Sequence, residues 1–222
     1  MDKPGLTILT PAYNRRNRID KLYDSLCRQT ENDFQWLVID DGSTDALDEY
    51  IAGLSGYTFR LDYYKKPNGG KHTALNFSHD YIRSDMVAIV DSDDYLTDDA
   101  VETILEYWDR YKNDEQIGGI TFLRSAYLKN TFPRRKLSDC TDQRLYPEDG
   151  IVDYYYRVKT NRNLIGGSFD IIKTSVLKRF PFPEYPGEKF VGDSYLWNMI
   201  GYDYKTVFLI KRYMFMRFSA TE

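Results

Sequence analysis

The first hundred residues alternate between short, largely apolar runs and segments in which apolar residues recur at helical spacing. The apolar runs cover residues 6–9, 36–39 and 86–90, and such runs are typical of strands buried on both faces of a sheet. Between them, apolar side chains recur at i, i+3, i+4 and i+7 over residues 19–26 and 47–54, which predicts amphipathic helices. Strands that alternate with helices build βαβ units, so the pattern predicts an α/β protein with a parallel sheet.

Polar side chains follow three of these predicted strands directly. They are Tyr13 and Asn14 after the first strand, Asp40 and Asp41 after the second, and Asp91, Asp93 and Asp94 after the third. In sheets of this kind, ligands bind outside the carboxyl ends of the strands. Three strand ends that deliver polar groups to one edge therefore predict a binding site there.

The run Asp91-Ser92-Asp93-Asp94 places three carboxylates within four residues. Like charges this close repel one another unless a cation or hydrogen-bond donors neutralise them. Mg²⁺ typically uses one or two protein carboxylates together with substrate phosphates. The run therefore predicts a site for a metal-bound diphosphate, and a solvated turn that caps the following helix stays open as the alternative.

The run Asp40-Asp41-Gly42-Ser43 predicts contacts to a nucleotide, because a carboxylate at a strand end can accept from a ribose hydroxyl or a base N–H. The sequence has no G-x-G-x-x-G motif after the first strand and no G-x-x-x-x-G-K-[ST] motif. These are the phosphate-binding loops of dinucleotide-binding enzymes and P-loop NTPases. Both classes are therefore disfavoured.

Charge and cysteine content narrow the function classes further. The chain carries 34 acidic against 30 basic residues, a net charge of −4, which argues against a protein that wraps nucleic acid. Two cysteines, Cys27 and Cys140, make neither a disulfide framework nor a zinc site, so a cytoplasmic protein is expected. No signal-peptide pattern or 18-residue apolar run is present. Basic and aromatic residues mix at 129–136 and 205–217, which leaves open solvated loops or peripheral contact with the inner face of the cell membrane.

The second half of the sequence is less regular. The pattern predicts a strand at 120–123, a long loop at 125–150, a short helix near 175–180, a helix from Asp193 and a final strand at 207–210. Because no internal repeat or linker divides the chain, we expect a single domain over residues 1–222.

Four motifs in fixed order identify a family. They are Thr10-Pro11-Ala12-Tyr13-Asn14, the run from Val38 to Asp45, the run from Asn68 to Asn76 and Asp91-Ser92-Asp93-Asp94. Their order resembles that of the family-2 inverting glycosyltransferases with the GT-A fold, over essentially the whole chain. The resemblance implies a Rossmann-like, mostly parallel central sheet flanked by helices, in which residues 1–100 bind a nucleotide sugar and residues 101–222 bind the acceptor. It also implies sugar transfer from a nucleotide diphosphate donor, most often a UDP-sugar, with Mg²⁺ or Mn²⁺.

The resemblance also implies roles for individual residues. The residues implied to bind the nucleotide are Pro11, Ala12, Tyr13, Asn14, Asp40, Asp41, Lys71, Asp91 and Ser92. The metal ligand is Asp93, and the residues implied to lie near the donor or acceptor sugar are Asp94, Gly166, Gly167, Ser168 and Trp197. Within this set, Asp41 would accept from the base N–H and Asp91 would contact the ribose. For His72, a contact to the donor and a loop imidazole without a role both remain open.

Inversion in this family is a single displacement, in which a carboxylate takes the proton of the acceptor hydroxyl. In the family this carboxylate begins a helix after a glycine-containing loop, and Gly192-Asp193 fits that description here. Asp193 is therefore the implied base, with Glu188 as the second candidate. Family members often have Glu-Asp where this chain has Gly-Asp. An aspartate at a helix start can also cap the helix, so a capping role stays open.

Two other functions are compatible with the same motifs. One is a non-catalytic domain that binds a nucleotide sugar within a larger assembly. The other is a nucleotidyltransferase, although that class usually has a Gly-rich loop with a basic residue where this chain has Pro11-Ala12-Tyr13-Asn14. For a transferase, we expect the acceptor to be a hydroxyl of a saccharide or of a lipid-linked saccharide.

Overall fold

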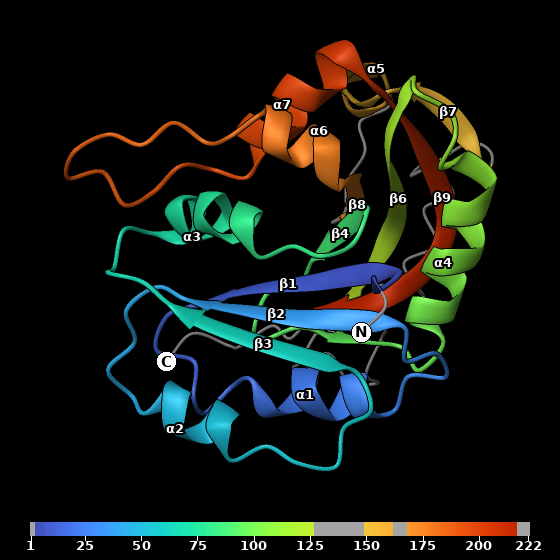
Figure 1. Ribbon diagram of the computed structural model, residues 1–222. Coiled ribbons are helices and arrows are strands. Elements are labelled where there is room, and N and C mark those ends of the chain that lie inside the picture. Colours follow the sequence, from blue (N-terminus) through green and yellow to red (C-terminus); the bar gives the residue numbers. More distant parts are fainter. Residues whose placement is uncertain (1–2, 127–148, 162–167, 217–222) are drawn as a thin grey trace, which may run out of the picture.

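The computed structural model describes residues 3–126, 149–161 and 168–216. Within these ranges one nine-stranded sheet has the order β3-β2-β1-β4-β8-β6-β9-β5, and β7 pairs with β9 (Figure 1). The strands are β1 (Leu6–Ala12), β2 (Phe34–Asp40), β3 (Arg60–Lys65), β4 (Met86–Ile89), β5 (Tyr95–Leu96), β6 (Ile117–Ala126), β7 (Ile151–Tyr154), β8 (Ser168–Lys173) and β9 (Lys205–Met216). The helices are α1 (Asp20–Cys27), α2 (Leu47–Ala52), α3 (Lys71–Phe77), the 3₁₀ turn η1 (Ser78–Asp80), α4 (Ala100–Tyr111), α5 (Tyr155–Asn161), α6 (Thr174–Arg179) and α7 (Ser194–Asp203).

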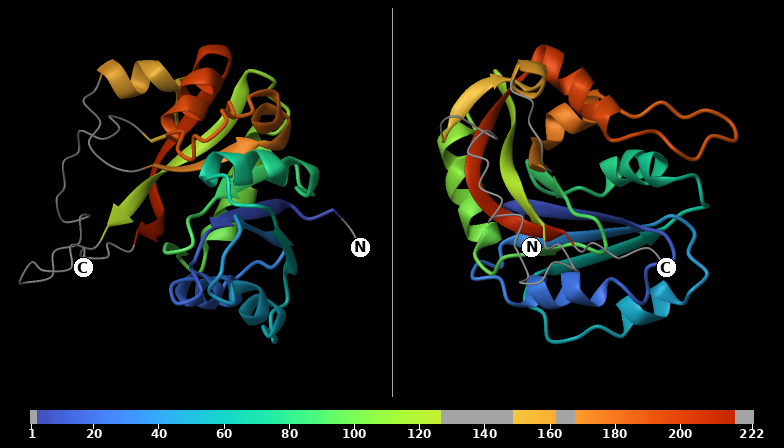
Figure 2. Two further views of the ribbon diagram at one scale, coloured as in Figure 1. Left: turned by 90° about the vertical axis from the view of Figure 1, so that its left-hand side faces the viewer. Right: turned by 180° about the vertical axis from the view of Figure 1, so that it is seen from behind.

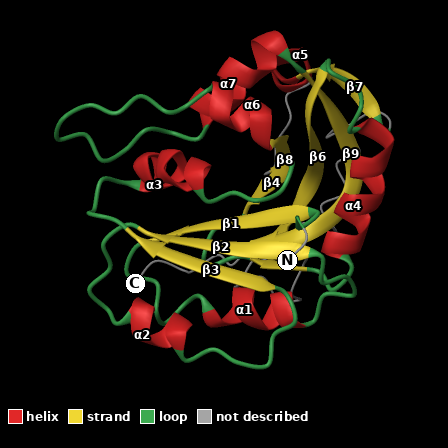
Figure 3. Cartoon of the chain, in the orientation of Figure 1, coloured by secondary structure: helices red, strands yellow, loops and turns green. Residues whose placement is uncertain are grey.

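The first half of the sheet is parallel, as the alternation of strands and helices predicts. Strand β1 pairs in parallel with β2 and β4, and β2 pairs in parallel with β3. All residues of β1 and β2 are buried, because α1 and α2 cover one face of these strands and α3 covers the other (Figure 3). Alternate side chains enter separate cores: Ile8 packs with the residues of α1, whereas Leu9 packs with those of α3.

The second half of the sheet is mixed. Strand β8 is antiparallel to both β4 and β6, β6 is parallel to β9, and β5 and β7 are antiparallel to β9. The α/β class and the flanked central sheet are confirmed, and the parallel region is confined to the first half and the β6–β9 pair. The sequence did not predict β8, because the buried Asp170 interrupts its apolar run; its carboxylate accepts from Thr121 Oγ1 at 2.5 Å and from Ser168 Oγ at 2.8 Å.

Residues 181–192, which we call the strap, connect α6 to α7 and reach outward past α3 (Figures 1 and 2). Asn76 of α3 holds the base of the strap: its Nδ2 donates to Phe182 O and its Oδ1 accepts from Phe182 N, both at 2.9 Å. The strap therefore extends the second half of the chain over the carboxyl ends of the first strands. No helix in the described part of the chain is long and apolar enough to cross a membrane.

Candidate active site

A pocket of about 380 Å³ lies at the carboxyl ends of β1, β2 and β4, the edge at which parallel sheets bind ligands. The residues that line it are Pro11, Ala12, Tyr13, Arg15, Asp41, Lys71, Asp91, Ser92 and Asp93. We call it the larger pocket. The structure thus brings together eight of the residues that the sequence nominated and adds Arg15. Sequence reasoning missed Arg15 because it is one of several arginines in a polar loop, with no spacing that separates it from the others.

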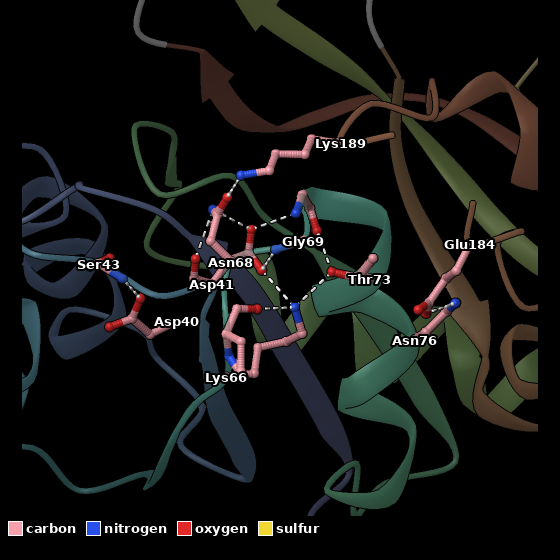
Figure 4. A network of polar contacts seen from close by, with 12 residues as sticks. Asp40, Asp41, Ser43, Lys66, Asn68, Gly69, Thr73, Asn76, Glu184 and Lys189 are labelled. Carbon is pink, nitrogen blue, oxygen red and sulfur yellow. Dashed lines mark hydrogen bonds and ion pairs between the residues drawn. The ribbon is translucent and has the colours of Figure 1, made fainter. Parts of the chain in front are cut away.

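Asp41 is the organising group of the loop that borders this pocket (Figure 4). Its Oδ1 accepts from Lys66 Nζ at 2.7 Å and from Gly69 N at 2.9 Å. Its Oδ2 accepts from Asn68 Nδ2 at 3.0 Å and from Gly70 N at 2.7 Å. The carboxylate is only 3% exposed, so the loop 66–70 is folded around a buried anion. A base N–H that donates to Asp41 would share an oxygen with two other donors, and this contact stays a prediction.

Asp40 does not reach the pocket, which corrects its assignment to the nucleotide. Its carboxylate is fully buried under the turn that follows β2, where Oδ1 accepts from Ser43 N at 2.7 Å (Figure 4). Its Oδ2 accepts from the Tyr63 hydroxyl. Burial, together with the adjacent Asp40, raises the pKa of Tyr63 far above its usual value, so the hydroxyl remains a donor. The carboxylate is therefore used within the fold.

Asn14 also serves the backbone rather than lining the larger pocket. Its backbone N donates to Ser43 Oγ and its Oδ1 accepts from Thr44 N, both at 2.9 Å. Its φ of 52° lies in the left-handed region, which asparagine tolerates better than most residues. Asn14 therefore ties the end of β1 to the end of β2, and its nucleotide contact stays a prediction.

Lys71 joins the two halves of the chain at the pocket. Its Nζ lies 2.8 Å from Asp91 Oδ1 and 3.0 Å from Asp193 Oδ2. Burial alone would lower the pKa of Lys71, but the two carboxylates outweigh it and raise the pKa above the usual value. Lys71 is therefore a permanent cation between the third strand end and the start of α7.

Asp193 stands at the N-cap position of α7, yet its side chain makes no capping hydrogen bond. The carboxylate instead points to Lys71 and is 57% exposed. The carboxylate is therefore directed to Lys71 and not to the start of the helix, and its role as the base stays a prediction. The second candidate, Glu188, lines neither this pocket nor the smaller one described below, and its Oε1 accepts from Phe190 N at 2.8 Å within the strap.

The acidic run after β4 divides between the pocket and the interior. Asp91, Ser92 and Asp93 line the larger pocket, whereas Asp94 does not and is 4% exposed, so its sugar contact stays a prediction. No group of three or more His, Cys, Asp or Glu side chains is placed to hold a metal ion within the described ranges. The Asp93 carboxylate in this pocket nevertheless fits Mg²⁺ or Mn²⁺, because such ions take hard oxygen ligands, often only one or two of them protein carboxylates, and complete their shell with phosphate oxygens.

The remaining nominated sugar-binding residues lie away from the larger pocket or outside the described residues. Trp197 stacks on Tyr155 with ring centroids 5.5 Å apart and packs against the core, and its contact to a sugar stays a prediction. Ser168 donates to Asp170 within β8, and its contact to a sugar also stays a prediction. Gly166, Gly167 and the basic cluster 129–136 lie outside the described residues. Among the basic residues of the segment 205–217, Lys205 has a described side chain, and its Nζ donates to Gln116 Oε1 at 2.9 Å.

A smaller pocket of about 180 Å³ adjoins the larger one. Its lining residues are Lys71, His72, Lys189, Phe190, Val191 and Asp193. His72 is 1% exposed, and neither of its ring nitrogens has a hydrogen-bond partner in the described part of the chain. Sequence reasoning left His72 undecided and missed Lys189 and Phe190, because the proline-rich strap has no periodicity from which a packed position can be predicted.

The strap closes onto the loop 66–70 at Gly70, and this contact gives a first prediction. Gly70 has a φ of 99°, and a Cβ there would meet Lys189 O at 2.0 Å. We expect Gly70→Ala to lower the free energy of unfolding by about 2–4 kcal/mol, from backbone strain and displacement of the strap. Gly56→Ala is the control, because Gly56 has a φ of 84° but nothing within 4 Å. Equal losses for the two variants in urea unfolding would show that the strap contact contributes nothing.

Comparison with known proteins agrees with the fold and shows the family. The family described as "Glycosyl transferase family 2" matches residues 7–185. The chain is 29% identical over 154 residues to glycosyltransferase GlyA of Streptococcus pneumoniae serotype 4, which covers 69% of this chain and 22% of that protein. It is 40% identical over 103 residues to chondroitin synthase of Pasteurella multocida, which covers 46% of this chain and 11% of that protein. The chain therefore spans less than a quarter of the length of these relatives.

Solved structures show the same architecture. S. aureus TarS 1-349 in complex with UDP-GlcNAc superposes with a TM-score of 0.71 at 21% identity, over 98% of this chain and 60% of that one. The mannosyltransferase PcManGT from Pyrobaculum calidifontis, in complex with GDP-Man and Mn²⁺, superposes with a TM-score of 0.60 at 18% identity, over 96% of this chain and 57% of that one. In open α/β sheets of nucleotide-binding proteins, the ligand binds outside the carboxyl ends of the strands, where the larger pocket lies in this chain. This chain belongs to glycosyl transferase family 2 and has the GT-A fold.

Proposed function

We propose that the chain forms the catalytic domain of a metal-dependent, inverting glycosyltransferase of the hexosyltransferase type. It would move a sugar from a UDP-sugar to a hydroxyl of a saccharide or of a lipid-linked saccharide. The observation that carries this proposal is the position of Lys71 Nζ, within 3.0 Å of both Asp91 and Asp193. This cation holds the candidate base of α7 beside the pocket in which the donor would bind.

The larger pocket offers suitable groups for a nucleotide diphosphate. The Tyr13 side chain is 47% exposed and presents its ring to a base, while Arg15 and Lys71 supply positive charge for phosphate oxygens. Asp93 would hold Mg²⁺ or Mn²⁺, and Asp91 would contact the ribose. When bound, such an ion supplies charge stabilisation for the departing diphosphate. Lys71 adds a fixed positive charge to the same leaving group.

Asp193 would act as the general base. As the acceptor oxygen attacks the anomeric carbon, its proton passes to the Asp193 carboxylate and the bond between that carbon and the diphosphate oxygen breaks. Attack opposite to the leaving group inverts the anomeric configuration in one step. The exposed carboxylate and the missing capping bond leave Asp193 available for this transfer.

The comparisons support the choice of donor and acceptor class. TarS was solved with UDP-GlcNAc and PcManGT with GDP-Man and Mn²⁺, so structures of this fold hold nucleotide sugars and a divalent ion. The chondroitin synthase and hyaluronan synthase of Pasteurella multocida, each 40% identical over 103 residues, are named for polysaccharide products. These names support a saccharide acceptor for this chain.

The test is the identity and metal dependence of the product. With a panel of UDP-sugars, we expect UDP release that requires Mg²⁺ or Mn²⁺, stops with EDTA and falls about 100-fold or more in Asp93→Asn. The control is Asp98→Asn, because Asp98 pairs with Arg28 on the surface, with side chains 59% and 54% exposed. Release of pyrophosphate would instead identify a nucleotidyltransferase. UDP binding without turnover on any donor or acceptor would identify a non-catalytic nucleotide-sugar-binding domain.

A further inference from the structure

The smaller pocket differs from the larger one in the catalytic group that it contains. Asp193 lines the smaller pocket but not the larger one, and Lys71 lines both. Lys71 is therefore the partition between them. A general base must lie within hydrogen-bond reach of the proton that it takes. If Asp193 is the base, as the proposed function holds, the acceptor hydroxyl must enter from the side of the smaller pocket.

His72 gives this pocket a polar group without a partner. The side chain is 1% exposed, and both ring nitrogens are buried without a hydrogen bond in the described part of the chain. An unsatisfied buried donor or acceptor costs roughly 1–3 kcal/mol, so such groups are uncommon and call for an explanation. A neutral imidazole has one donor and one acceptor nitrogen. Sugar hydroxyls can donate and accept at once, so a bound sugar can satisfy this ring.

Phe190 gives the same pocket an apolar surface. Its side chain is 80% exposed, although phenylalanine is a residue that the fold would otherwise bury. The carbon face of a pyranose ring presents aligned C–H groups that pack on an aromatic ring. A pocket with one aromatic platform and few polar groups is typical of small-ligand sites.

The strap holds Phe190 in position before any ligand binds. Lys189 Nζ donates to Asn68 Oδ1 at 2.7 Å, and Phe190 N donates to Glu188 Oε1 at 2.8 Å (Figure 4 for Lys189 and Asn68). Asn68 in turn donates to Asp41, so the strap is anchored to the loop that the buried carboxylate organises. A site whose supporting residues are already bonded has less ordering entropy to lose when it binds a ligand.

We propose that the smaller pocket binds one pyranose ring of the acceptor, with His72 as its hydrogen-bonding group and Phe190 as its stacking platform. The acceptor is then a saccharide whose terminal ring enters the pocket, and not a bare lipid or protein hydroxyl. This inference rests on the proposed function for the direction of transfer, but it assigns a sugar site that is measurable without turnover.

The experiment measures sugar binding directly. The full chain is mixed with UDP and Mg²⁺, and saturation-transfer NMR titrations follow the methyl β-glycosides of glucose, N-acetylglucosamine and glucuronic acid. We expect at least one glycoside to bind with signals from its ring protons. Phe190→Ala and His72→Phe should each raise its Kd by about fivefold or more, because each removes one contact to the ring. Tyr185→Ala is the matched control, since Tyr185 is an aromatic residue of the same strap, 63% exposed, that does not line the pocket.

Thermal unfolding separates a ligand contact from a structural role. His72→Phe keeps a ring of similar size and removes two nitrogens that have no partner, so its Tm should not fall. A Tm lowered as much as that of a core variant such as Leu75→Ala would mean that His72 is structural, and this would overturn its assignment. The stacking role is overturned if Phe190→Ala binds the glycosides as the wild type does.

The outcomes also distinguish this inference from the proposed function. UDP affinity is measured by calorimetry on the same protein preparations before UDP is added for NMR. If UDP binds but none of the three glycosides does, the pyranose site is wrong and the donor site stands. If glycosides bind and respond to the two variants while UDP does not bind, the sugar site stands and the proposed donor is wrong.

Discussion

Asp193→Asn is expected to lower kcat for sugar transfer by about 10³-fold, while the affinity for UDP is not weakened. Asparagine keeps the shape of the side chain and its bond to Lys71, but it cannot accept the acceptor proton. General-base catalysis typically contributes a factor of about 10² to 10⁴. UDP affinity is preserved because Asp193 does not line the larger pocket, and because Asp91 still holds Lys71 at 2.8 Å. UDP release and calorimetric UDP binding, measured on one preparation, check both parts.

The control for this variant is Asp203→Asn, at the other end of the same helix. Asp203 Oδ2 lies 3.1 Å from Arg179 on the surface, where side chains are 44% and 58% exposed. Exposed pairs contribute little to stability, so kcat and Tm should both stay near wild type. A rate retained in Asp193→Asn but lost in Glu188→Gln would move the base to Glu188, although the structure places that residue outside both pockets.

The sequence predicts which strand ends meet but not which side chain turns toward the ligand. Short apolar runs followed by acids predicted the edge correctly, and the larger pocket lies there. Asp40 and Asp41 are adjacent, and successive residues of a strand point to opposite faces. One carboxylate therefore lies beneath the turn against Tyr63 while the other lies at the loop 66–70. No local pattern distinguishes the two, because the partners come from β3 and from the loop after it.

The contacts made by the strap could not be predicted from the sequence either, because their partners are distant along the chain. The strap contains Pro181, Pro183 and Pro186 and has no periodic apolar stripe, so the sequence predicts only that regular structure stops. Its position is set by bonds to side chains more than a hundred residues earlier, as between Lys189 and Asn68. The helix that follows was predicted, since Asp193 precedes an apolar run with helical spacing. The smaller pocket could therefore not be predicted from the sequence, because it depends on where the strap and α7 lie relative to α3.

Asp41→Ala is expected to produce the largest loss of stability among the site residues, about 3–5 kcal/mol. The change leaves Lys66, whose side chain is 13% exposed, as a buried ammonium without its anion at 2.7 Å. The backbone N–H groups of Gly69 and Gly70 lose their acceptor in the same step. Breaking a buried ion pair on one side is costly, because the remaining charge keeps its desolvation penalty. Urea unfolding followed by circular dichroism measures the loss.

Two further variants distinguish the cost of leaving Lys66 unpaired from the cost of shortening an aspartate side chain. Asp48→Ala breaks the exposed pair with Lys65, whose side chains are 47% and 40% exposed, and should leave the urea midpoint unchanged. Adding Lys66→Met to Asp41→Ala removes the orphaned cation and should recover part of the stability, so the two changes will not be additive. If Asp41→Ala costs no more than Asp48→Ala, the loop 66–70 is held by other contacts. In that case the Asp41 carboxylate would be free to serve the nucleotide, as the sequence alone suggested.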